Sequence, residues 1–199
     1  MLRYCLLPGD PARAERIAAR FDSSEETIRN REFLGFRGTV GGVPLGVCST
    51  GIGGSSASIA VEELANVGVD TFIRVGSAGG RQETIPVGSL VAVTAAHRGE
   101  GTSLAYLPPE FPAVADQALA ELLSKDGGVV AAEQECATVF IVATVRRVRC
   151  WGSTRTSSCR GGSRRRRSAS PGKRRRGRSG SPSRRCSCWR SGTRQTIRR

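Results

Sequence analysis

The stretch Thr71-Phe-Ile-Arg-Val-Gly-Ser-Ala-Gly-Gly80 decides the fold that we expect for this chain of 199 residues. Its first half is apolar or β-branched apart from Arg74, which predicts a strand over Thr71–Val75. The small residues that follow predict a turn where this strand ends. A charged side chain in an apolar strand is costly to bury unless it is paired or faces a ligand. We therefore expect Arg74 either in a buried ion pair or in an anion site at the carboxyl end of the strand.

Segments typical of strands and of helices alternate outward from this stretch. Strands are expected at Arg3–Leu7, Phe33–Val40, Val43–Ser49 and Ser89–Ala95, and helices at Ala12–Phe21, Ala57–Val67, Pro112–Leu123 and Cys136–Val148. Asp10 is a candidate N-cap with Pro11 at the first helical position. Gly41 and Gly42 predict a tight hairpin. Together these signals predict an α/β fold with a mixed central sheet flanked by helices.

Charge divides the chain into two unlike parts. The formal net charge is +14, yet all 17 acidic residues lie between Asp10 and Glu135. Residues 1–145 hold 11 basic and 17 acidic residues, a net charge of −6, and the other 20 basic residues follow without any acid. We therefore expect a domain over residues 1–148 and a disordered, Arg/Ser-rich tail over residues 149–199.

Two origins stay open for this tail. As a genuine segment, Arg164–Arg176 would bind nucleic acid through its charge, without sequence specificity. The alternative is a reading-frame shift in a GC-rich gene, which the abrupt change of composition favours. The tail's Cys residues have no His beside them and no C-x-x-C spacing, so they do not indicate a zinc site.

The remaining cysteines and the hydropathy bear on the cellular compartment. Cys5, Cys48 and Cys136 lie in apolar runs, where we expect reduced core thiols of a cytoplasmic protein. The sequence has no run of eighteen apolar residues, so we expect no membrane span.

Two further clusters are candidate sites. Thr50–Ser56 is a Gly-rich loop before a helix, which suits a phosphate cradle or an ordinary tight turn. Glu133 and Glu135 precede an apolar helix, where carboxylates either offset the helix dipole or hold the vicinal hydroxyls of a sugar. Their spacing does not place both on one helix face, so it does not favour a metal pair.

Six motifs, taken in order, resemble one known family. They are Leu7-Pro-Gly-Asp-Pro-Ala-Arg13, Arg31-Glu-Phe33, Cys48-Ser-Thr-Gly-Ile-Gly-Gly54, Ile59-Ala-Val-Glu-Glu-Leu64, Ile73-Arg-Val-Gly-Ser-Ala-Gly79 and Phe111-Pro-Ala-Val-Ala-Asp116. Together they resemble the uridine phosphorylases of the nucleoside phosphorylase-I family over residues 3–116, and the resemblance resumes at Glu133–Val148.

The resemblance implies reversible phosphorolysis of a nucleoside such as uridine to a free base and ribose 1-phosphate. Inorganic phosphate would be the co-substrate, and no metal or other cofactor is implied. The residues that match the family's phosphate site are Gly9, Arg13, Arg31, Arg74 and Ser77. Those that match its ribose site are Glu133, Gln134 and Glu135, with Gln134 in place of a methionine. Arg74 and Glu135 would carry the catalysis.

The family is also oligomeric, which implies a homo-oligomer (a hexamer, or an assembly built from dimers) in which Arg31 reaches a neighbouring subunit. Arginines that hold phosphate bidentately can aim it at the anomeric carbon. The negative charge of the phosphate would then stabilise the oxocarbenium character that develops on the ribose.

The sequence departs from the family at three places. It begins at the first strand, without the family's preceding His-bearing segment. Asp126–Ala132 replaces a stretch of several dozen family residues that contains the base-recognising elements. Arg149–Thr156 stands where an apolar core strand is expected. We therefore expect weak or absent activity and no visible selection of the base. Two alternatives stay open: a nucleosidase of the same fold, and a non-enzymatic protein that binds nucleic acid through the tail.

Overall fold

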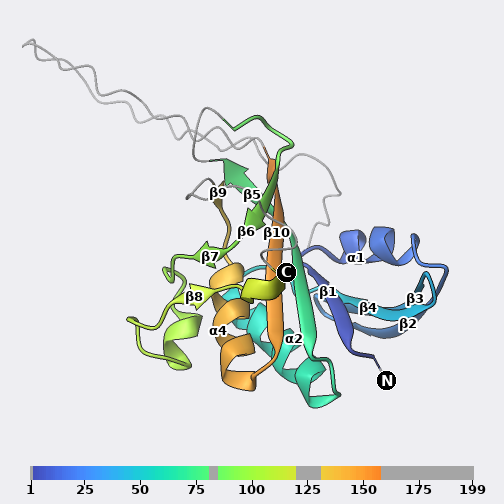
Figure 1. The fold of residues 1–199 in the computed structure, drawn as a ribbon. Helices are drawn as coiled ribbons and strands as arrows, with labels where there is room; N and C mark the ends of the chain where they lie inside the picture. Colours follow the sequence, from blue (N-terminus) through green and yellow to red (C-terminus); the bar gives the residue numbers. More distant parts are fainter. Residues whose placement is uncertain (1, 81–84, 120–130, 158–199) are drawn as a thin grey trace, which may run out of the picture. The chain divides into compact units, whose positions relative to one another are not determined.

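The computed structural model describes residues 2–80, 85–119 and 131–157, all within the unit Met1–Gly161 (Figure 1). Most of the expected tail, residues 158–199, lies outside the described residues, and so does its expected disorder. Every helix in the described part is too short or too polar to traverse a lipid bilayer.

One large sheet organises the domain. Its strands are β1 (Tyr4–Pro8), β2 (Ser23–Asn30), β3 (Phe33–Val40), β4 (Val43–Cys48), β5 (Thr71–Gly80), β6 (Leu90–Val93), β9 (Ala131–Ala132) and β10 (Arg149–Ser157). The order across the sheet is β2-β3-β4-β1-β5-β10-β6, and β9 also pairs with β5. The four strands β4, β1, β5 and β10 run parallel, whereas β2, β3 and β6 join with antiparallel pairing. The predicted mixed sheet is thereby confirmed.

The helices and short elements complete the domain. The helices are α1 (Pro11–Ala18), α2 (Gly54–Asn66) and α4 (Cys136–Arg146), with one 3-10 turn, η1 (Thr102–Ala105). Two short strands, β7 (Ala95–Ala96) and β8 (Ala113–Val114), pair with each other apart from the large sheet.

The predicted signals at the start of α1 and in the hairpin are met in detail, whereas α1 ends at Ala18, before the predicted Phe21. Asp10 caps α1, because its Oδ1 accepts a hydrogen bond from the amide of Ala12 at 3.0 Å, and Pro11 begins the helix. The turn between β3 and β4 needs two positive φ angles, and Gly41 (φ 57°) and Gly42 (φ 78°) supply them.

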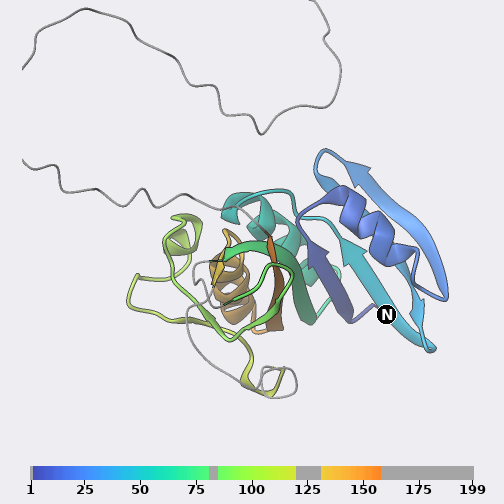
Figure 2. The ribbon, with the colours of Figure 1, turned by 90° about the horizontal axis from the view of Figure 1, so that it is seen from above.

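The helices cover both faces of the sheet, because neighbouring side chains of a strand point to opposite sides. Leu7 of β1 joins the larger core cluster together with Phe72 of β5 and Phe140 of α4. Its neighbour Leu6 packs on the smaller cluster beneath α1, which includes Ala14. Figure 2 shows α1 beside the part of the sheet formed by β2, β3 and β4. Helices α2 and α4 therefore share one face, and α1 lies on the other.

The end of the folded domain requires a correction. The sequence predicted a boundary after Val148, but Arg149–Ser157 forms β10, hydrogen-bonded between β5 and β6. Cys150 and Thr154 of this strand are buried. The β-branched threonines suit a strand, and both neighbours satisfy its main-chain groups. The arginines of this segment led us to expect disorder, but the residues between them have short side chains that fit the interior.

A second correction concerns the helix expected over Pro112–Leu123. Its beginning is extended instead, because Ala113–Val114 forms β8. The amide of Ala115 donates to the carbonyl of Thr94, and that of Asp116 donates to the carbonyl of Cys150. These bonds tie the segment to β7 and β10, so tertiary contacts override the helical spacing. Residues 117–119 are helical, as expected, and Oδ1 of Asp116 accepts a hydrogen bond from the amide of Leu119 at 3.0 Å. The rest of the expected helix, residues 120–123, lies outside the described residues.

Candidate active site

Arg74 lies near the centre of the sheet with only 3% of its surface exposed. The strand is longer than predicted, so Arg74 is in the middle of β5, but it pairs in register with Leu7 near the carboxyl end of β1. Its Nη1 donates to the carbonyl of Leu7 and to Oγ1 of Thr50, each at 3.3 Å. Arg74 therefore faces the edge where the carboxyl ends of β1 and β4 meet.

Two carboxylates meet Arg74 from the start of α4. Nη2 of Arg74 donates to Oε2 of Glu135 in a buried ion pair. Its Nε lies 3.7 Å from Oε2 of Glu133, too far for a hydrogen bond, and no described residue accepts from it. The ion pair that the sequence offered as one alternative is therefore present, and it leaves the Nε donor of the guanidinium without an acceptor in the described part of the chain.

Glu133 and Glu135 have different roles in the structure. Glu133 accepts hydrogen bonds from the amides of Glu135 (3.0 Å) and Cys136 (2.8 Å), so it caps the start of α4. Glu135 is 6% exposed, and its Oε1 accepts from the amide of Gly53 at 2.7 Å. The Gly-rich loop thus holds a carboxylate of the chain itself, and the helix-dipole interpretation applies to Glu133.

Gly9 gives the site close access to Arg74. A Cβ atom at Gly9 would lie 3.0 Å from the carbonyl of Gly51 and 3.5 Å from Nη1 of Arg74. A Cβ atom would therefore press on the carbonyl of Gly51 and fill the space next to the guanidinium, so the main chain approaches Arg74 closely here because residue 9 is glycine.

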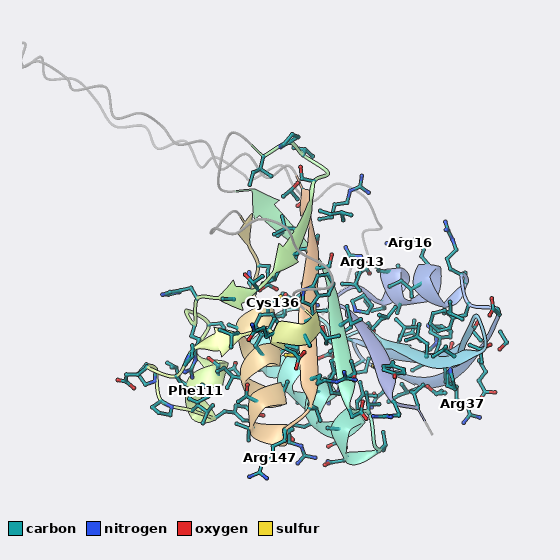
Figure 3. The ribbon with its side chains drawn as sticks, in the orientation of Figure 1. Arg13, Arg16, Arg37, Phe111, Cys136 and Arg147 are labelled. Atoms are coloured by element: carbon teal, nitrogen blue, oxygen red, sulfur yellow. The ribbon has the colours of Figure 1, made fainter. Side chains whose placement is uncertain are left out.

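Arg13 reaches the same region from α1. Its Nη1 donates to the carbonyl of Val75 at 3.0 Å, which places its guanidinium beside the residue that follows Arg74. Figure 3 shows Arg13 on the side of α1 nearer to β5, with Arg16 further out on the same helix. The side chain of Arg16 is exposed and lies 3.5 Å from Asp10.

The other expected site residues do not contact this cluster within the described chain. Ser77 is exposed on β5 beyond Arg74, and Gln134 is exposed between the two glutamates. Arg31 is exposed in the turn between β2 and β3 with φ of 52°, and among the described residues its side chain has no ion pair. The structure therefore brings together Gly9, Arg13, Arg74, Glu133 and Glu135.

Sequence reasoning missed Thr50 and the amide of Gly53 as partners within the site. Thr50 supplies an acceptor to Arg74, and Gly53 supplies a donor to Glu135. The available signal was the order of the chain: the Gly-rich loop follows an apolar strand, and carboxyl ends of parallel strands meet at one edge. That order could place the loop, but it could not show which group each residue would bind.

The cysteines in the described part of the chain belong to the core. Cys5, Cys48 and Cys136 are buried free thiols, as predicted, and Cys150, expected in the tail, is a fourth. Burial raises the pKa of Cys48 to about 11 and that of Cys150 to about 12. Within the described ranges, no three His, Cys, Asp or Glu side chains gather as a metal site requires.

Comparisons with known proteins agree on the kind of chain this is. The family model of the phosphorylase superfamily matches residues 3–159, which include β10. A uridine phosphorylase from Treponema pallidum is 52% identical over 113 residues, 57% of this chain and 44% of the relative. One from Klebsiella aerogenes is 48% identical over 139 residues, 70% of this chain and 53% of the relative. A guanosine phosphorylase from Halorubrum lacusprofundi is 49% identical over 119 residues, 59% of this chain and 49% of the relative. The chain spans about half the length of these relatives.

Proposed function

The chain belongs to the phosphorylase superfamily, and we propose that it carries out the reversible phosphorolysis of a nucleoside, uridine first among those to test. Phosphate attacks C1′ of the ribose, the bond from C1′ to the base breaks, and ribose 1-phosphate and the free base result. The similar uridine phosphorylases support this reaction. Because a guanosine phosphorylase is similar as well, the proposal does not include a preference between bases.

The observation that carries the proposal is the buried guanidinium of Arg74, whose Nε has no acceptor among the described residues. A phosphate oxygen can take this place, since buried N–H groups are nearly always hydrogen-bonded. Gly9 keeps the approach to Nη1 free of a side chain, and Arg13 adds a second guanidinium beside Val75. Arginine suits this task because its planar donors match phosphate oxygens.

We assign the phosphate and ribose roles by combining these contacts with the family resemblance. The proposed phosphate site consists of Gly9, Arg13, Arg31, Arg74 and Ser77, and the proposed ribose site consists of Glu133, Gln134 and Glu135. Glu135 would accept hydrogen bonds from the ribose hydroxyls while its ion pair with Arg74 fixes its position. The phosphate on Arg74 would therefore lie next to the sugar, where its charge stabilises the oxocarbenium-like ribose.

The exposed Arg31 fits a homo-oligomer, built from dimers or a hexamer, in which it completes a neighbour's phosphate site. Phosphate is the co-substrate, and the proposed reaction uses no other cofactor. The four buried free thiols support a reducing compartment, which we take to be the cytoplasm. We expect slow turnover, because Asp126–Ala132 stands where the family carries residues that recognise the base.

The test is phosphate-dependent release of uracil from uridine by the purified chain. We expect release only when phosphate is present, and we expect Arg13→Gln to raise the KM for phosphate by about tenfold or more, as loss of a hydrogen bond to a charged ligand does. Arg16→Gln, on the same helix but exposed, is the matched control and should leave this KM unchanged. Release at the same rate without phosphate would show a nucleosidase and refute the proposal.

A further inference from the structure

Arg98 holds together a loop that none of the expected site residues belongs to. All five N–H donors of its guanidinium are used within residues 98–111. Nε donates to Oγ of Ser103 at 3.0 Å, and Nη2 donates to the carbonyls of Ser103 (2.8 Å) and Leu107 (2.6 Å). Nη1 donates to the carbonyls of Phe111 (2.8 Å) and Pro108. Such saturation fixes one loop conformation, because a bound arginine fork loses little freedom per bond.

The loop that Arg98 fixes lies against the start of α2. Glu100 accepts from the amide of Ser103 at 3.1 Å, so the same serine joins Arg98 to Glu100. Thr102 shares a hydrogen bond with Ser55 of α2, with 2.9 Å between their hydroxyl oxygens. A Cβ atom at Gly54 would lie 2.9 Å from Oε2 of Glu100 and 3.1 Å from Oγ1 of Thr102. The loop thus packs directly on the first turn of α2.

The start of α2 in turn holds Glu135. The amide of Gly53, the residue before Gly54, donates to Oε1 of Glu135 at 2.7 Å, and the other oxygen of this carboxylate pairs with Arg74. A continuous series of contacts therefore leads from Arg98 through its loop to the carboxylate proposed to hold the ribose. On the phosphate side of the site, Gly9 and Arg13 make no described contact with this loop, and Arg74 is also held by Leu7 and Thr50, independently of Glu135.

We propose that Arg98 is a positioning residue for the nucleoside: it orders residues 98–111, and this loop holds the Gly53 amide on Glu135. The inference rests on the proposed function for the role of Glu135, and it adds a residue outside the site that sets nucleoside affinity without setting phosphate affinity. Loss of Arg98 frees the loop, the amide of Gly53 moves off the carboxylate, and Glu135 no longer presents a fixed oxygen to the ribose.

The experiment compares the full chain with Arg98→Gln by two measurements. Hydrogen exchange read at the Gly53 amide reports the contact with Glu135 whether or not the chain turns over. We expect faster exchange in Arg98→Gln, together with a fall of about tenfold in kcat/KM for uridine and an unchanged KM for phosphate. Arg146→Gln is the matched control, because Arg146 ties α4 to Glu62 of α2, away from Gly53. This variant should change neither the exchange at Gly53 nor kcat/KM for uridine.

A double-mutant cycle tests the route of the effect. Ser55→Ala removes the hydroxyl contact with Thr102 from an exposed position, so the chain should fold normally. If Arg98 acts through this contact, Arg98→Gln will lower kcat/KM for uridine by a smaller factor in the Ser55→Ala background than in the wild type. Three results would each overturn the inference: additive effects of the two substitutions on kcat/KM, a rise in the KM for phosphate as large as the fall in kcat/KM for uridine, or unchanged hydrogen exchange at the Gly53 amide. Absence of uridine cleavage in the wild type, with exchange at Gly53 still faster in Arg98→Gln, would instead refute the proposed function and leave the loop contact supported.

Discussion

Arg74 can keep its charge inside the sheet because two carboxylates from the start of α4 lie beside it. A buried ion pair of this kind contributes little when both partners are present, since desolvation offsets most of the attraction. Its importance is that neither partner can be removed alone. The sequence could indicate that Arg74 needs a partner, because its neighbours in the strand are apolar. It could not show that the partner is Glu135, since 61 residues separate the two.

At this residue scale we predict that Glu135→Gln lowers the free energy of unfolding by about 3 kcal/mol, because it removes the one carboxylate to which the buried guanidinium donates and leaves only Glu133 nearby, at 3.7 Å. Urea unfolding followed by circular dichroism measures the change. Glu25→Gln is the control: Glu25, on the exposed strand β2, pairs with the exposed Arg37 of β3, so this variant should lose almost no stability. Equal losses for the two variants would contradict the buried pair.

Cys150 gives a prediction for alkaline pH. Burial raises its pKa from 9.0 to about 12, so the unfolded chain ionises this thiol at a lower pH than the folded chain does. The folded state then binds the extra proton, and the stability that it contributes below pH 9 is lost as the pH rises towards 12. Cys150→Ala should make the fall of the unfolding free energy with pH shallower, by up to about 1.4 kcal/mol per pH unit. Identical slopes would show that Cys150 is not buried.

At the scale of elements, β10 shows where sequence reasoning succeeds and where it stops. The strands around Cys5, Phe72 and the Gly41-Gly42 hairpin were predictable, because apolar runs and paired glycines report local structure directly. Residues 149–157 have no such run, and only their pairing with β5 and β6 makes them a strand. Tertiary contacts also turned the start of the helix expected at Pro112 into β8. Non-local pairing of this kind leaves no periodic signal in the sequence.

We predict that Gly152→Ala in β10 destabilises the domain by about 1–3 kcal/mol, as overpacking does. A Cβ atom there would lie 2.9 Å from Sγ of Cys136 and 3.2 Å from Cβ of Val93. Gly79→Ala in β5 is the matched control, since a Cβ atom at Gly79 meets no atom of the described residues within 4 Å. Thermal unfolding of the two variants measures the difference. An unchanged melting temperature in Gly152→Ala would mean that β10 does not pack under α4.

At the scale of the whole molecule, the net charge of +14 is a poor guide to the proposed site. The part that the structure describes holds 14 acidic and 13 basic residues, so its charges nearly cancel. Its anion-binding potential comes from a few arginines placed by α1 and β5. Most of the remaining basic residues lie in residues 158–199, outside the described part, so non-specific binding of nucleic acid through them stays a prediction. Charge counted by position, rather than summed, is what separates these two roles.

The candidate site, like the fold, was predictable from the sequence only in part. The family motifs located Gly9, Arg13, Arg74, Glu133 and Glu135, which the structure gathers around one buried guanidinium. The same motifs included Arg31, Ser77 and Gln134, which lie exposed in the single chain. The loop around Arg98 carried no signal, because four of the five hydrogen bonds that Arg98 donates go to main-chain carbonyls, which any sequence supplies.

The central claim is that phosphate bound at Arg74 attacks a nucleoside held at Glu135. Single-turnover cleavage with the protein in excess over uridine tests it most directly, because slow turnover does not hide the chemical step. We predict that uracil and ribose 1-phosphate form together when phosphate is present and that neither forms when it is omitted. Free ribose in place of ribose 1-phosphate, or no cleavage at any protein concentration with phosphate present, would contradict the account.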